Sequence, residues 1–170
     1  MVSTLVLKEF GLFNGLDDNE LARIAELCQE HTLKRGELIF SEGTKAAHLH
    51  LCRSGKVDVV IRVREPWNKN VTVHTAGAGE LFGWSAMVAP YTYTASAECA
   101  EDGEEIRITG SELLKLFDKN PRIGLVVWRN LSAEISARLT QTRQRLSTEW
   151  LTAGIPSSGG SSTWGEPKRR

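Results

Sequence analysis

From residue 31 to residue 109 the chain alternates short β-prone stretches with turns rich in glycine and polar residues. The stretches lie at residues 31–34, 37–40, 47–52, 56–63, 71–76, 93–99 and 104–109. In the longest of them Val57, Val59, Ile61 and Val63 alternate with mostly charged positions, which is typical of an antiparallel strand with one buried face. No segment long enough for a helical crossover separates the stretches. The pattern therefore predicts about seven or eight strands in an antiparallel β-roll or jelly roll.

An amphipathic helix is expected before this β region. Leu21, Ile24 and Ala25 recur at helical spacing, and the positions between them are mostly polar. Asp17 and Glu20, three residues apart, predict a capping box at the start of the helix.

Helical spacing returns after the β region. Thr109 and Glu112 predict a second capping box ahead of a short helix. Asn120-Pro121 then predicts the start of a long helix, about 45 Å at 1.5 Å per residue, that continues to Gly154.

The long helix carries part of a coiled-coil pattern. Trp128, Ile135, Leu139 and Leu146 recur at spacings of seven and four, but polar residues fill two of the seam positions, Ser132 and Thr142. Two interpretations stay open, namely a homodimer through this helix and simple packing of the helix on the roll.

Together these elements predict a mainly β fold with flanking α-helices. The expected architecture is an antiparallel β-roll or jelly roll (double-stranded β-helix) with an N-terminal helix and a long C-terminal helix. We expect the domain to cover residues 1–150. Residues 151–170 include a run of glycine, serine and proline that cannot bury enough apolar surface to become ordered, so a disordered tail is expected there.

Composition narrows the classes of function. The 170 residues include 21 basic and 21 acidic side chains, so the chain lacks the positive excess of a nucleic-acid binder. The three cysteines, Cys28, Cys52 and Cys99, have no short spacing that would indicate a disulfide framework or a zinc site. No run approaches the roughly 18 apolar residues of a membrane span, and no export signal is visible. These features predict a cytoplasmic protein with reduced thiols.

The segment at residues 77–97 is the most informative for function. It begins rich in glycine, and we expect a short helix from Gly83 to Val88 whose first N–H groups form an anion site. Glu80 is a poor partner for an anion but a good acceptor for a sugar hydroxyl, so the pair suggests a ribose phosphate. In the alternative interpretation Gly79 and Gly83 only serve tight turns and Glu80 faces water.

Four motifs, in this order, resemble the cyclic nucleotide-binding domain, which is the sensor of bacterial Crp/Fnr regulators and of protein kinase A regulatory subunits. They are LFNGL at residues 12–16, GELIFSEG at 36–43, GKVDV at 55–59 and GELFG at 79–83. The resemblance implies a β-roll with a phosphate-binding cassette that begins at the last motif. We use the name cassette for residues 79–94.

The resemblance also implies roles for single residues. In that family a glutamate of the cassette binds the ribose 2′-hydroxyl, and backbone N–H groups at a helix start hold the cyclic phosphate. By match, Glu80 takes the first role and the backbone of residues 82–85 the second. Thr142 falls where the long helix of the bacterial members offers a hydroxyl to the base. The expected ligand-binding residues are Gly79, Glu80, Leu81, Phe82, Gly83, Trp84, Ser85, Tyr91, Thr92 and Thr142.

The cassette departs from the family pattern where an arginine should meet the phosphate, because the chain reads PYTY at residues 90–93. A charge-assisted pair contributes about 1.5–3 kcal/mol, so its loss predicts an affinity lower by roughly tenfold to a few hundredfold. Thr92 can still donate one neutral hydrogen bond.

The resemblance does not extend to the winged helix-turn-helix of Crp/Fnr regulators, so no DNA reading is expected through this chain alone. The predicted function is a stand-alone cyclic nucleotide-binding regulatory module whose ligand is cAMP or cGMP. Its output would be an effector protein or its own homodimer. The alternative is a degenerate fold that serves as a protein-interaction or dimerisation scaffold, and the missing arginine favours it.

An enzymatic reading has little support in the sequence. Its best form is a metal-binding cupin barrel, because His48 and His50 would point to one face of a strand at roughly 6.5 Å. The cupin pattern also requires a glutamate shortly afterwards, where this chain has Ser54 and Gly55. No nucleophile elbow or activated cysteine is recognisable. We therefore expect no enzyme, no cofactor and no metal site.

Overall fold

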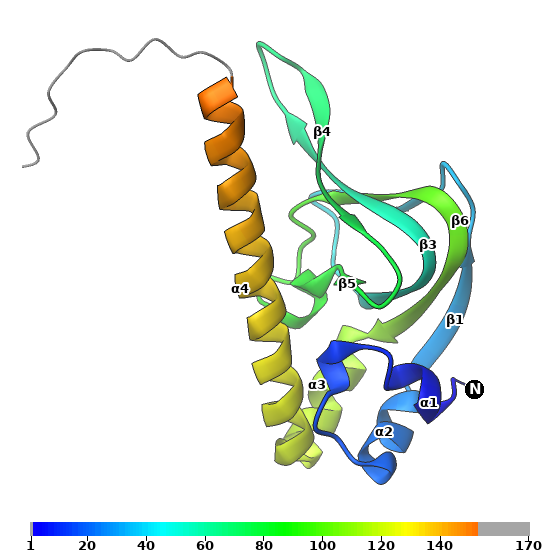
Figure 1. Ribbon diagram of the computed structural model, residues 1–170. Helices are drawn as coiled ribbons and strands as arrows, with labels where there is room; N and C mark the ends of the chain where they lie inside the picture. The colour runs from blue at the N-terminus through cyan, green and yellow to red at the C-terminus, as the bar shows by residue number, and fades with distance from the viewer. Residues whose placement is uncertain (1, 153–170) are drawn as a thin grey trace, which may run out of the picture. The chain divides into compact units, whose positions relative to one another are not determined.

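The computed structural model describes residues 2–152, and the chain divides into two compact units after Ser136 that are described separately. The first unit contains a six-stranded antiparallel sheet that curls into a roll (Figure 1). Its strands are β1 (Cys28–Leu33), β2 (Leu38–Phe40), β3 (His48–Val63), β4 (Lys69–Ala76), β5 (Leu81–Phe82) and β6 (Ser96–Thr109). The predicted β-roll with flanking helices is confirmed.

The sheet is organised around its two longest strands, β3 and β6, which pair with each other. The path through the sheet runs β1-β6-β3-β4, with β2 added to β6 and β5 added to β3. The predicted count of seven or eight strands is wrong, since residues 47–52 and 56–63 fall largely in one strand and residues 93–99 and 104–109 in another.

Two glycines explain why these strands bend without breaking. A Cβ on Gly103 would lie 2.1 Å from the carbonyl oxygen of Ser54, and a Cβ on Gly55 would lie 2.5 Å from that of Glu101. The two backbones therefore approach more closely than any other residue type allows, and the register shifts there while the ladder continues.

A bulge lies in β4 where it pairs with β3. The partner of Val59 is His74 and the partner of Val60 is Thr72, so Val73 is the extra residue. On β3 itself, Val57 and Val60 are buried. Val59 and Ile61 are only half-buried. The predicted alternation therefore holds in part: Ile61 and Val63 stay half-buried and Arg62 is exposed, but Val60 is buried as well as Val57.

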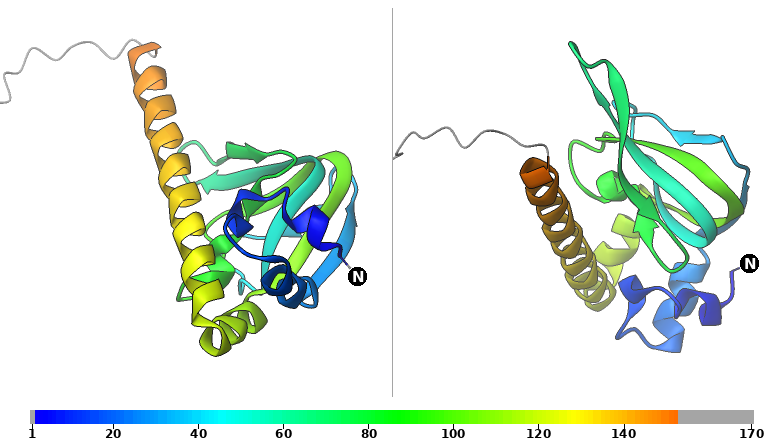
Figure 2. Two further views of the ribbon diagram at one scale, coloured as in Figure 1. Left: turned by 60° about the horizontal axis from the view of Figure 1, so that its bottom comes forward. Right: turned by 45° about the horizontal axis from the view of Figure 1, so that its top comes forward.

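The short helices before and after the sheet lie together at one end of the roll (Figures 1 and 2). They are α1 (Thr4–Leu7), η1 (Gly11–Phe13), α2 (Asp18–Ala25) and α3 (Gly110–Lys119). The capping box of α2 is confirmed, since Asp17 accepts from the Glu20 N–H and Glu20 accepts from the Asp17 N–H, both at 2.9 Å. The box predicted for α3 is wrong. Thr109 makes no side-chain capping bond because it still belongs to the ladder of β6, opposite His48.

Helix α4 (Pro121–Thr152) begins at the predicted proline and extends into the second unit. Within that unit Leu139 and Leu146 are about half exposed, at 48% and 51%. The helix includes the first two residues of the expected tail, and residues 153–170 lie outside the described part of the chain. No helix among residues 2–152 is both long and apolar enough to cross a membrane.

The sheet is covered on both faces. One apolar cluster joins Leu49, Leu51, Ile106 and Ile108 to the helices, and a second cluster fills the roll around Phe82, as follows: Leu33, Cys52, Val57, Ala76, Phe82, Ala97 and Cys99. All three cysteines are free thiols. Burial raises the pKa of Cys28 to about 12 and that of Cys52 to about 11, and it also raises the pKa of Cys99.

Candidate functional site

The first half of the cassette is held against β3 by backbone hydrogen bonds. The Gly79 N–H donates to the carbonyl of Cys52 at 2.9 Å, and the Cys52 N–H donates to the carbonyl of Glu80 at 2.8 Å. Residues 81–82 then pair as β5 with residues 50–51 of β3. The entry to the cassette is therefore an extension of the sheet.

Gly83 ends β5 and turns the chain into a short helix. Its φ of +73° lies in the left-handed region, and a Cβ there would lie 2.8 Å from Cδ2 of His50 and 3.2 Å from the ring of Phe40. Only glycine meets both conditions without strain. The 3-10 helix η2 (Trp84–Met87) follows, inside the range predicted for a helix.

Glu80 holds its own turn together. One carboxylate oxygen accepts from the Gly77 N–H at 2.7 Å, and the other lies 3.4 Å from Nε2 of His74 on β4. The Glu80 side chain is 42% exposed, so solvent still reaches it. Sequence reasoning missed His74, because nothing local connects it to Glu80; pairing of β4 with β3 brings it there.

Trp84 and Ser85 are half-buried at the start of η2. The Trp84 side chain packs against the large core cluster. Of the ten expected ligand-binding residues, the structure places 79–85 in one continuous stretch along β3 and at the start of η2.

The second half of the cassette has an ordered frame but no cation of its own. The Ala46 N–H donates to the carbonyl of Tyr91 at 2.8 Å, and the Tyr93 N–H donates to that of Thr44 at 2.9 Å. Thr92 is thereby paired with Lys45 across an isolated antiparallel bridge. Directly opposed residues project to the same face, so Lys45 is a cation beside the place of the missing arginine. Sequence reasoning had no signal for this pairing.

Tyr91 and Thr92 differ in exposure. Tyr91 is 42% exposed, whereas Thr92 is half-buried and its hydroxyl donates to the Pro90 carbonyl at 3.5 Å. Thr142 belongs to the second unit, where its hydroxyl donates to the Arg138 carbonyl at 2.9 Å.

His48 and His50 lie close together on β3. Their ring centroids are 6.1 Å apart, but His50 is buried with its Nδ1 at 2.9 Å from Glu105. Within residues 2–152 no group of three or more histidine, cysteine or carboxylate side chains is arranged to hold a metal ion.

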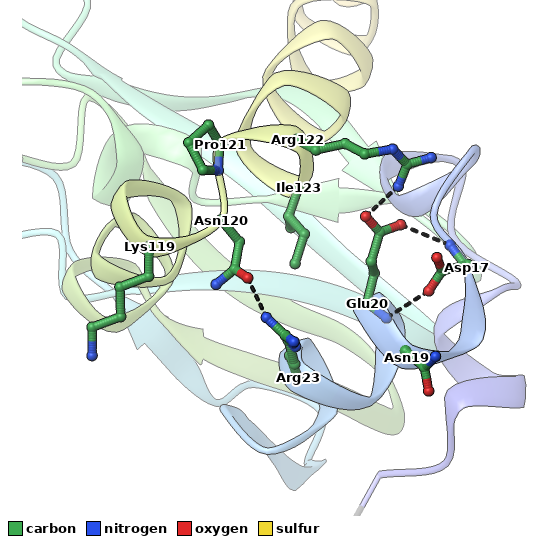
Figure 3. Close-up of a pocket in the computed structure, with 9 residues that line it drawn as sticks. All are labelled: Asp17, Asn19, Glu20, Arg23, Lys119, Asn120, Pro121, Arg122 and Ile123. Atoms are coloured by element: carbon green, nitrogen blue, oxygen red, sulfur yellow. Dashed lines mark hydrogen bonds and ion pairs between the residues drawn. The ribbon is translucent and has the colours of Figure 1, made fainter.

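A cavity of about 420 Å³ lies between α2 and the junction of α3 with α4, away from the cassette (Figure 3). Glu20 pairs with Arg122 across it, and Arg23 donates to the side-chain oxygen of Asn120. These two contacts join α2 to the start of α4.

A family model described as the cyclic nucleotide-binding domain matches residues 30–120, more than half of the 170 residues. The match runs from β1 past the end of α3 and includes the whole cassette. The chain belongs to the cyclic nucleotide-binding domain family.

Relatives of known sequence and structure agree with this membership. The chain is 23% identical over 141 residues to the CRP-like cAMP-activated global transcriptional regulator of Mycobacterium tuberculosis, which covers 83% of this chain and 60% of that protein. The chain thus spans less than two thirds of that relative.

Solved structures show the same roll. A protein of Geobacter metallireducens GS-15 named for cyclic nucleotide binding is 31% identical, with a TM-score of 0.73, and the match covers 82% of this chain and 99% of that one. A cyclic nucleotide-binding domain from Methylobacillus flagellatus KT has a TM-score of 0.75 at 20% identity, with 86% and 82% covered, and supports the fold alone.

Proposed function

We propose that this chain is a regulatory module that binds cAMP or cGMP at the cassette with lower affinity than a cassette that carries the arginine. The observation that carries the proposal is the backbone of residues 79–85, which is hydrogen-bonded to β3 and then turned by a left-handed glycine. Family membership supports a regulatory role for this backbone frame, since domains of this family generally act as regulatory sensors.

The ribose is assigned to Glu80. An ionised carboxylate has about four lone-pair sites, and one of them accepts from the Gly77 N–H in a short hydrogen bond. The side chain is accessible enough to accept a sugar hydroxyl in addition to the Gly77 N–H. His74 lies on the other side of the same carboxylate and would orient it.

The phosphate is assigned to the backbone of residues 82–85. Successive N–H groups after a left-handed glycine form a concavity that suits an anion. No arginine stands at residues 90–93, so Tyr91 and the Thr92 hydroxyl would supply neutral contacts only, and Lys45 would act through its charge at longer range. Thr142 is proposed for the base.

The output of the module is proposed to be binding rather than catalysis. No catalytic constellation was recognisable in the sequence, and an effector protein or a homodimer through α4 would read the state of the cassette. The homodimer is supported by the heptad spacing of Leu139 and Leu146, which are both about half exposed. We expect the protein to act in the cytoplasm and without direct DNA contact.

A scaffold function is the second candidate, and the absence of an arginine at residues 90–93 favours it. In that case the roll would be kept for protein contacts and the cassette would bind no nucleotide.

Calorimetric titration of the full chain with cAMP and with cGMP tests the proposal, with metal analysis of the same sample. We expect saturable binding that weakens about tenfold in Glu80→Gln. The control is Glu98→Gln, an exposed carboxylate on β6 that should leave binding unchanged. Absence of binding to the unaltered chain at millimolar nucleotide would favour the scaffold.

A further inference from the structure

A buried polar network lies directly beneath the cassette. His50 on β3 and Glu105 on β6 are 2% and 0% exposed, and His50 Nδ1 lies 2.9 Å from Glu105 Oε2. The second Glu105 oxygen accepts from Nε of Arg107. The other ring nitrogen of His50 lies 3.4 Å from the hydroxyl of Tyr93. The proposed nucleotide contacts use none of these side chains.

The hydrogen-bond directions indicate which form of His50 the network accepts. An ionised Glu105 can only accept, so Nδ1 must carry a proton. The single hydroxyl proton of Tyr93 is donated to the carbonyl of His48 at 2.9 Å, and the His48 N–H donates to the same hydroxyl oxygen at 3.2 Å. That oxygen can then only accept from Nε2. Both ring nitrogens of His50 therefore face acceptors, and the imidazolium satisfies the network.

Both ends of the cassette contact this histidine. At the entry, Phe82 is paired with His50 across the sheet and stacks on its ring with centroids 4.9 Å apart, and Gly83 lies against the ring edge. At the exit, Tyr93 approaches Nε2 and stacks on Phe40 at 3.7 Å, and Phe40 is itself 5.2 Å from the His50 ring. His50 thus connects the entry and the exit of the cassette.

The charged and titratable groups around His50 are Glu105 and Arg107 on β6, His48 on β3, and Tyr93. Burial and the positive charges of His50 and Arg107 lower the pKa of His48, so it does not compete for the proton. Burial raises the pKa of Tyr93, which keeps its hydroxyl protonated. With His50 protonated, the side chains of His50, Glu105 and Arg107 carry a net charge of about +1, which favours an anionic ligand above them.

We propose that His50 is a positioning residue of the cassette whose protonation favours nucleotide binding. The imidazolium holds the entry through Phe82 and Gly83 and the exit through Tyr93. When Nε2 loses its proton to water, its lone pair becomes an acceptor, and the Tyr93 hydroxyl turns from the His48 carbonyl to Nε2. The exit end then loses a bond to β3, and the charge under the phosphate disappears. The effect on affinity rests on the proposed function, but the movement of the cassette does not.

Nuclear magnetic resonance of the full chain without nucleotide tests the movement. As the pH is raised and His50 loses its proton, we expect the His50 ring signals and the amide signals of Gly83 and Tyr93 to shift together with one common midpoint. His50→Gln should abolish the shift of these amides. The matched control is His31→Gln: His31 lies opposite Glu105 in the β1–β6 ladder, but its side chain pairs with another carboxylate, Glu37 at 3.0 Å. Amide signals that stay constant while His50 titrates would overturn the proposal.

Nucleotide titration provides the second measurement. It is made at the two pH values at which the resonance measurement shows His50 protonated and neutral. Between them affinity should fall by about fivefold in the unaltered chain and by less than about twofold in His50→Gln. If no nucleotide binds at either pH, the proposed function fails, and the resonance measurement still decides the role of His50. An equal pH dependence in both proteins would contradict that role.

Tyr93→Phe provides an independent variant in case His50→Gln does not fold. It keeps the stack on Phe40 and removes only the hydroxyl. The amide shift with pH should remain at Gly83 and disappear at residue 93. If residue 93 still responds in the phenylalanine variant, the Tyr93 hydroxyl is not the connection and the proposal is wrong.

Discussion

The two ends of the cassette differ in what forms the proposed binding surface, namely the backbone at the entry and side chains at the exit. At the entry, residues 79–85 are placed by backbone bonds to β3 and by a glycine turn, and this geometry is the proposed binding surface itself. At the exit, residues 90–94 also have an ordered frame, through pairing with residues 44–46, but the cation that the frame should present is absent. A site made by the backbone is retained with the fold, whereas a site made by one side chain can be lost while the fold stays intact.

The largest loss of stability is expected when Glu105 is changed, because it pairs with His50, the residue that both ends of the cassette contact. Glu105→Gln leaves His50 and Arg107 buried or half-buried without their counter-charge, and it should lower the free energy of unfolding by about 3–5 kcal/mol. Glu104→Gln, on the exposed side of β6 next to Arg53, should cost less than about 1 kcal/mol. Urea denaturation measures both, and equal losses would contradict the special place of Glu105.

The stability that Glu105 contributes should also depend on pH. Burial opposes ionisation of Glu105, but the hydrogen bond from His50 and the charges of His50 and Arg107 lower its pKa below the ordinary 4.5. The stability that this group contributes is therefore present above that value and is lost as the pH falls through the lower, folded-state value. Unfolding free energies measured from pH 7 down to pH 3 should fall less steeply in Glu105→Gln.

The entry end alone is broken by Gly83→Ala. The substitution combines a left-handed φ with a Cβ that meets His50 and Phe40, so it should cost about 2–4 kcal/mol of stability. Gly36→Ala is the control, because Gly36 has a φ of +84° but nothing within 4 Å of the added Cβ, and only the conformational cost of about 1–2 kcal/mol applies. Equal costs would show that contact with His50 does not constrain the entry.

The exit end is restored by Thr92→Arg, or by Tyr91→Arg. Either should tighten cyclic nucleotide binding by about tenfold or more, because a bidentate charged contact replaces a neutral one. Thr94→Arg, at an exposed position, controls for a general gain of positive charge. If neither variant binds at millimolar nucleotide by calorimetry, the frame alone is insufficient and the scaffold function is favoured.

The smallest effect is expected from the remaining cation at the exit. Lys45→Ala should weaken binding about two- to threefold at low salt and less at high salt, since an exposed charge is screened. Lys34→Ala, another exposed lysine, should have no effect. A loss of tenfold or more would instead make Lys45 a direct phosphate ligand.

Elements set by neighbouring residues were predictable from the sequence. The α2 capping box depends on Asp17 and Glu20, three residues apart, and it is present. The roll followed from regular strand spacing. The continuous strands were not predictable, because they depend on contacts such as Gly103 against Ser54, which only the folded sheet brings together. The bulge at Val73 of β4 likewise depends on pairing with β3.

The sequence could predict where along the chain the candidate site begins, but not which residues lie beneath it. The motif at residues 79–83 located the entry, but the network below it joins residues 55 positions apart, His50 and Glu105. A partial signal existed, since His50 stands among leucines in a strongly apolar stretch. Alternation would assign Glu105 and Arg107 to a solvent-facing side, and this fails because the sheet is covered on both faces.

The protonated thiols in the core make the protein a convenient background for site-specific labelling. A thiolate reacts and a thiol does not, and with a pKa of about 11 or 12 Cys52 and Cys28 are almost entirely protonated at neutral pH. Maleimide probes should therefore attach to two added surface cysteines while the three native cysteines remain in place. Distances between such probes can then follow the cassette in solution without any change to the interior of the roll.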